Sequence, residues 1–104
     1  MRTSDLSRLS NRELILDLAL NFARIGRFFA RSPETAAPFF TENRAYLAEL
    51  DRRDLPKSFL PTYRAASAAF ADMAASTPDR VTEDAFTWAL LLERRAGFAQ
   101  GEAA

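Results

Sequence analysis

The sequence predicts an all-α fold: four helices packed as an antiparallel up-and-down bundle and joined by short, Pro-containing turns. Almost every stretch has apolar residues at helical spacing. The chain contains only three glycines, Gly26, Gly97 and Gly101. Because β-hairpin turns usually need glycine, hairpins are not expected. Because 48% of the 104 residues are hydrophobic, we expect residues 1–104 to form a single helical domain with a packed core.

The first helix has the clearest start signal. Residues 1–9 are expected to form a short N-terminal turn. Ser10 and Glu13 then have the spacing of a capping box, in which each residue binds the other's backbone N–H. We therefore predict a helix over residues 13–31, which ends because Pro33 disfavours helical geometry at the residue before it.

Prolines also divide the middle of the chain. Two prolines five residues apart predict a short turn over 33–37, followed by a second helix over 38–53. Pro56 and Pro61 bracket the next start, so the third helix is predicted over 61–75.

Thr82 is the predicted cap of the fourth helix. Acidic residues follow it directly, where the positive end of the helix dipole favours them. Gly97 is the predicted stop, and residues 100–104 are expected to form a frayed tail.

The first and fourth helices carry more apolar surface than one small bundle readily hides. The first is either a central helix touched by the other three, or presents part of its wide apolar arc to a second copy or another protein. The fourth is apolar on more than one side, although its aromatic residues could also lie in the monomer core. We predict a homodimer, a complex with another protein, or both. The predicted contact residues are Leu16, Phe22, Phe29, Phe86, Trp88, Leu91 and Phe98.

Asn43 falls inside the apolar stripe of the second helix. A polar side chain there must find hydrogen bonds or lie at a solvated margin. Two interpretations stay open: a capping or inter-helix hydrogen bond, and a polar contact that sets a specific pairing register.

The chain lacks the side chains that most enzymes and metal sites use. It contains no His and no Cys, no Gly-rich phosphate loop and no GxSxG motif. Glu13 and Asp17 lie one helical turn apart, but two carboxylates alone are a weak metal signal. We therefore expect no catalytic residues, no cofactor and no metal.

The charge balance argues against nucleic acid as the main partner. Fourteen basic and fourteen acidic residues cancel to a formal net charge of zero. Arg24, Arg27 and Arg31 nevertheless align at helical spacing, which supports an alternative hypothesis of a nucleic-acid-binding regulator that uses this face.

We expect no association with a membrane. Charged and polar residues interrupt the most apolar stretch, residues 14–29, so it matches neither a membrane span nor a signal peptide. The sequence thus predicts a small, cytoplasmic, non-catalytic protein–protein interaction module of regulatory, adaptor or inhibitor type, which self-associates through apolar helix faces.

Overall fold

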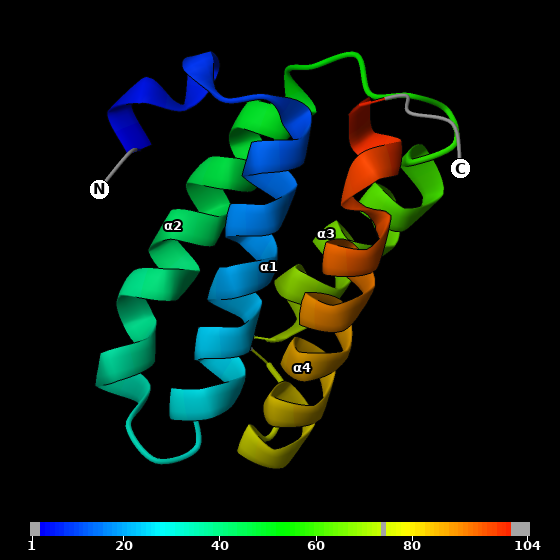
Figure 1. Ribbon diagram of the computed structural model, residues 1–104. Coiled ribbons are helices and arrows are strands. Elements are labelled where there is room, and N and C mark those ends of the chain that lie inside the picture. The colour runs from blue at the N-terminus through cyan, green and yellow to red at the C-terminus, as the bar shows by residue number, and fades with distance from the viewer. Residues whose placement is uncertain (1–2, 74, 101–104) are drawn as a thin grey trace.

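A computed structural model describes residues 3–73 and 75–100 and confirms the predicted four-helix bundle (Figure 1). Successive helices run in opposite directions, and α1 packs mainly against α4 and α2. The helices are α1 (Asn11–Phe28), α2 (Pro33–Asp51), α3 (Leu60–Met73) and α4 (Pro78–Arg95), with short 3-10 helices η1 (Thr3–Arg8) and η2 (Ala96–Gln100) at the two ends.

The start of α1 is the predicted capping box. The Ser10 hydroxyl accepts a hydrogen bond from the Glu13 backbone N–H at 3.0 Å, and the Ser10 N–H donates to the Glu13 carboxylate at 2.9 Å. The helix ends at Phe28 rather than at Arg31, because the next residues form a tighter turn: the N–H of Arg31 donates to the Phe28 carbonyl, three residues back, at 3.1 Å.

The second helix differs from its predicted bounds because it begins at Pro33 and passes through Pro38. Ser32 is the cap, and its hydroxyl accepts a hydrogen bond from the Thr35 N–H at 3.3 Å. Pro33 suits the first helical position, where its missing N–H costs nothing. Pro38 removes one backbone hydrogen bond from the helix without ending it.

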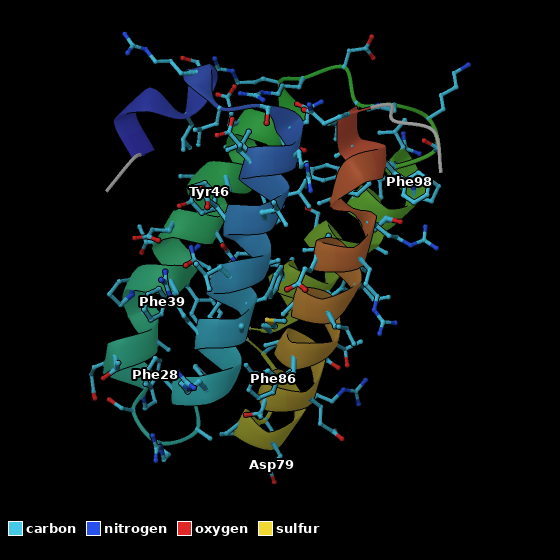
Figure 2. The ribbon with its side chains drawn as sticks, viewed as in Figure 1. Phe28, Phe39, Tyr46, Asp79, Phe86 and Phe98 are labelled. Carbon is cyan, nitrogen blue, oxygen red and sulfur yellow. The ribbon has the colours of Figure 1, made fainter. Side chains whose placement is uncertain are left out.

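Two aromatic pairs pack this first part of α2 against α1. The rings of Phe28 and Phe39 are stacked with centroids 6.3 Å apart (Figure 2). The ring centroids of Phe29 and Phe40 lie 5.6 Å apart. We infer that this packing outweighs the hydrogen bond lost at the proline. The turn predicted over 33–37 was therefore wrong.

The start of α4 also differs from the prediction. Thr77 is the cap, since its hydroxyl accepts a hydrogen bond from the Arg80 N–H at 3.4 Å, and Pro78 takes the first helical position. Thr82 lies inside the helix, where its hydroxyl donates to the Pro78 carbonyl at 3.1 Å. A threonine followed by proline was thus the stronger start signal.

The end of α4 continues directly into η2, which contains Gly97. Gln100 is held there, because its side-chain oxygen accepts a hydrogen bond from the Arg12 N–H at 3.2 Å. The first residue of the predicted frayed tail is therefore fixed, and residues 101–104 lie outside the described residues.

The core is built around α1. The side chain of Phe22 meets the ring of Phe70 from α3 edge-on, with centroids 5.9 Å apart. As predicted in the first of the two interpretations, α1 is therefore a central helix over most of its circumference. The large side chains of α1 that have no exposed surface are Leu14, Ile15, Leu18, Phe22 and Ile25.

Arg53 ties the end of α2 to the start of the chain. Its guanidinium donates to the carbonyls of Leu9 at 2.7 Å and Leu6 at 2.9 Å, and to the side-chain oxygen of Asn11 at 3.0 Å. Its Nε donates to the Glu49 carboxylate at 3.0 Å. One partly buried side chain thus satisfies polar groups of η1, α1 and α2, and the planar fork of arginine suits this better than a lysine would.

Arg53→Met is expected to lower the free energy of unfolding by about 2–4 kcal/mol, because it leaves these acceptors without their donor. Urea denaturation followed by circular dichroism measures the change. Arg52→Met is the matched control, because the Arg52 side chain is 75% exposed and should cost less than about 0.5 kcal/mol. Equal losses for the two variants would contradict this role.

Asn43 lies in the core rather than at a solvated margin. It has no exposed surface, and neither its side-chain nitrogen nor its oxygen has a hydrogen-bond partner in the described part of the chain. Neither of the two bonding interpretations is therefore seen. Asn21, which is also buried, differs because it donates to Glu42 at 3.0 Å and accepts from Arg24 at 3.2 Å.

Asn43→Leu should raise the free energy of unfolding by about 1–3 kcal/mol, because it replaces unpaired polar atoms with an apolar group of similar shape. Asn21→Leu, the control, should lower it, because two polar partners lose their contact. Both values come from urea denaturation. A loss of stability on Asn43→Leu would show that a water molecule or another group satisfies Asn43.

Candidate interaction surface

Small residues line the contact between α1 and α4. A Cβ atom at Gly26 would lie 3.0 Å from the ring of Phe86, so that ring rests directly on the glycine. Ala19 lies two turns before Gly26 on the same side of α1 and is buried, as is Ala85 of α4. Small side chains let the two helix axes approach closely.

Helices α1 and α4 lie side by side in opposite directions, and contacts at both ends of α1 fix their register. At one end Arg12 and Asn11 hydrogen-bond to Gln100 and Ala99 of η2, the latter at 2.8 Å. At the other end Gly26 meets Phe86. The last turn of α1 therefore lies level with the middle of α4.

The large apolar side chains beside this contact are left partly outside. Leu20 is 49% exposed, Phe86 48% and Leu90 49%. Figure 2 shows Phe86 between the lower parts of α1 and α4. Leu16, one turn before Leu20, is half-buried. We call this surface the α1–α4 face and define it as Leu16, Leu20, Ala23, Phe86, Ala89 and Leu90.

Charged residues border the α1–α4 face at the end where Gly26 meets Phe86. Arg27 is exposed and lies two turns after Leu20, on the same side of α1. Glu83 is exposed and lies one turn before Phe86, on the same side of α4. The border is therefore basic along α1 and acidic along α4.

Of the predicted contact residues, Leu16 and Phe86 lie on the α1–α4 face. Phe22 has no exposed surface and packs against Phe70, so it is not available to a partner in this structure. This corrects the prediction for that residue. Phe22 was predicted as a contact residue because it is large and apolar, and these properties suit a core position equally well.

The other predicted contacts lie elsewhere. Phe29 packs on Phe40 between α1 and α2, and Phe98 is half-buried against the core. Trp88 and Leu91 face the groove between α3 and α4. The predicted set therefore does not form one surface.

The groove between α3 and α4 consists of two adjoining hollows of about 650 and 290 Å³, both lined by Trp88. Leu91 and Arg95 line the smaller hollow. Arg80 and Asp84, which form an ion pair at 3.5 Å, line the larger one. The groove is thus more polar than the α1–α4 face.

Leu20 and Leu90 belong to the α1–α4 face but were not among the predicted contacts. Each lies one helical turn after a residue that was predicted, Leu16 and Phe86 respectively. That spacing was the available signal, because residues four apart share a helix face.

Arg24, Arg27 and Arg31 do not form a free row. The guanidinium of Arg24 lies over the ring of Phe39, 5.3 Å from its centroid, and donates to Asn21. Arg27 and Arg31 are exposed. The first arginine of the predicted anion-binding face is thus already engaged by the protein.

Neither a metal-binding cluster nor a membrane-spanning helix is found among the described residues. No group of three or more Asp, Glu, His or Cys side chains is placed to hold a metal ion there. None of the helices in that part of the chain combines the length and the apolar character that a membrane crossing requires.

Comparisons with models of known protein families, with curated proteins and with solved structures find no match to this chain. The bundle and its α1–α4 face therefore define the class of protein by themselves: a small helical bundle with an exposed apolar face.

The acidity of the Tyr63 side chain is clearly altered by its surroundings. Its hydroxyl donates to the Leu47 carbonyl at 3.0 Å and to the Asp51 carboxylate, which links α3 to the end of α2. Burial raises the pKa of Tyr63 above its ordinary value of 10.0, and the hydrogen bond and negative charge of Asp51 raise it further. A phenol that resists ionisation serves as a structural donor rather than as a catalytic base.

Tyr63 should make stability depend on pH only in alkaline solution. Because its pKa is raised in the folded state, the stabilisation is complete below the unfolded value of 10.0 and is lost as the pH rises above it. Tyr63→Phe should lower the free energy of unfolding by about 1–2 kcal/mol at pH 7 and flatten its decline above pH 10. Denaturation curves across this range test it, and equal slopes for both proteins would contradict it.

Proposed function

We propose that this protein is a non-catalytic protein–protein interaction module that self-associates through the α1–α4 face. The observation that carries the proposal is the gathering of Leu20, Phe86 and Leu90, each about half exposed, on one surface. Contiguous exposed apolar residues with a charged border are typical of protein contacts.

The size of this surface suggests a modest affinity. Covering the exposed half of such a side chain contributes about 1 kcal/mol. A symmetric contact covers each of them twice, so the gain is on the order of 6 kcal/mol before the cost of association is counted. We therefore expect weak self-association, with a Kd of about 0.1 mM or weaker, as suits a regulatory or adaptor protein.

The composition supports a non-catalytic role in the cytoplasm. The chain contains no His to act as a base near neutral pH and no Cys to act as a nucleophile or to form disulfides. A reducing compartment is compatible with such a chain.

Nucleic-acid binding is the weaker alternative. Arg27 and Arg31 are exposed at the end of α1, but Asp79 and Glu83 are exposed at the start of α4 beside them. These carboxylates would repel a phosphate backbone. A mobility shift that weakens with salt would be needed to revive this alternative.

Sedimentation equilibrium at concentrations up to about 1 mM tests self-association. The wild-type chain should dimerise, and Leu90→Glu should weaken the dimer about tenfold or more, because it places a charge in the apolar contact. Leu91→Glu is the matched control: this neighbouring leucine is 37% exposed but faces the α3–α4 groove, so dimerisation should persist. A monomeric wild-type chain, or equal effects of the two substitutions, would contradict the proposal.

A further inference from the structure

A hollow of about 330 Å³ opens at the end of the bundle where α1 turns into α2, at the bottom of Figure 1. We call it the α1–α2 hollow. Its walls are apolar except for one threonine and one arginine. Pockets that bind small molecules have volumes of about 300–1,000 Å³, so this hollow is large enough for a small ligand. The residues that line it are Phe29, Pro33, Ala37, Phe40, Thr41 and Arg44.

The aromatic wall of the α1–α2 hollow continues into the core. The ring centroids of Phe29 and Phe40 lie 5.6 Å apart, and those of Phe40 and Phe70 also lie 5.6 Å apart. Phe70 in turn meets the fully buried Phe22 at 5.9 Å. Aromatic rings attract further rings through offset-stacked and edge-to-face contacts. A ring that enters the hollow therefore extends a row of rings that is anchored in the core.

Arg44 carries the charge of the α1–α2 hollow. It is exposed and lies one turn after Phe40, about 6 Å further along the axis of α2. Its guanidinium forms no ion pair and no hydrogen bond with a side chain in the described part of the chain. The carboxylate of Glu34 does not line the hollow and accepts a hydrogen bond from the Ser32 hydroxyl at 3.4 Å. The hollow thus combines aromatic walls with one unpaired positive charge.

The hollows between α3 and α4 lack this combination. In the larger one Arg80 is paired with Asp84. In the smaller one Arg95 donates a hydrogen bond to the Thr62 hydroxyl at 3.2 Å. The arginines of those hollows already have partners, whereas Arg44 is left to bind an anion from outside.

We propose that the α1–α2 hollow binds a small molecule that combines an aromatic ring with one carboxylate. The ring lies against Phe29 and Phe40. The carboxylate accepts hydrogen bonds from the Arg44 guanidinium, whose planar fork matches two carboxylate oxygens. This site lies apart from the α1–α4 face, so the inference does not depend on the proposed self-association. A ligand of about eleven heavy atoms should bind with a Kd of about 1–10 mM.

The probe for this site is 3-phenylpropionate, an aromatic carboxylate. Titration of the isotope-labelled full chain to about 30 mM probe, followed by ¹H–¹⁵N NMR, should give saturable shifts that centre on the residues lining the hollow. The neutral 3-phenylpropionamide, which has nearly the same shape, should bind about fivefold more weakly. Shifts that do not saturate, or that centre on Leu20 and Leu90 of the α1–α4 face, would overturn the proposal.

Arg44→Gln tests the charged part of the site. It should weaken binding of 3-phenylpropionate about fivefold and remove the preference over the amide, because the carboxylate loses its partner. Arg12→Gln is the matched control, since this exposed arginine lies at the opposite end of α1 and its loss lowers the net charge equally. Equal affinities of the two variants would show that the hollow does not use Arg44, and would overturn the proposal.

Ala37→Leu tests the apolar part. Ala37 is exposed and lines the hollow, so a leucine there suits the helix and fills the space meant for the ring. This variant should lose binding, and circular dichroism checks that the bundle is kept. Undiminished binding would overturn the proposal. Leu90→Glu, which weakens the proposed dimer, should bind the probe as the wild type does, so the two proposals succeed or fail separately.

Discussion

Burial of α1 on three sides is the constraint on which the rest of the fold depends. Each of the other helices contacts it through a different interaction: α2 through a hydrogen bond to Asn21, α3 through the ring of Phe70 against Phe22, and α4 through Phe86 on Gly26. A helix that buries more than half of its circumference needs neighbours on several sides. The bundle is thus a set of helices arranged around α1 rather than four equivalent pairs.

This arrangement also explains why apolar side chains reach the surface. Where α4 approaches α1 closely, only small residues such as Gly26 and Ala85 fit between the helices. Phe86 lies across Gly26 with about half of its surface exposed, and Leu20 lies along the outside of the contact. The exposed apolar face is therefore a consequence of the close approach of α4 to α1.

Interactions between residues close in sequence made the helices predictable. The exposure of individual side chains was less predictable. The spacing of Ser10 and Glu13 gave the start of α1, because a capping box depends on residues close in sequence. The passage of α2 through Pro38 depends on aromatic packing against α1, which no local pattern contains. The exposure of a side chain is likewise set by neighbours distant in sequence. Phe22 and Phe86 are both phenylalanines in predicted helices, yet Phe22 is buried and Phe86 is about half exposed.

The zero net charge of the chain bears on which partner such a face can accept. Fourteen acidic and fourteen basic residues leave no overall repulsion between two copies, so local contacts decide whether and how they associate. The same neutrality that weakens attraction to nucleic acid thus leaves the choice of a partner to local contacts.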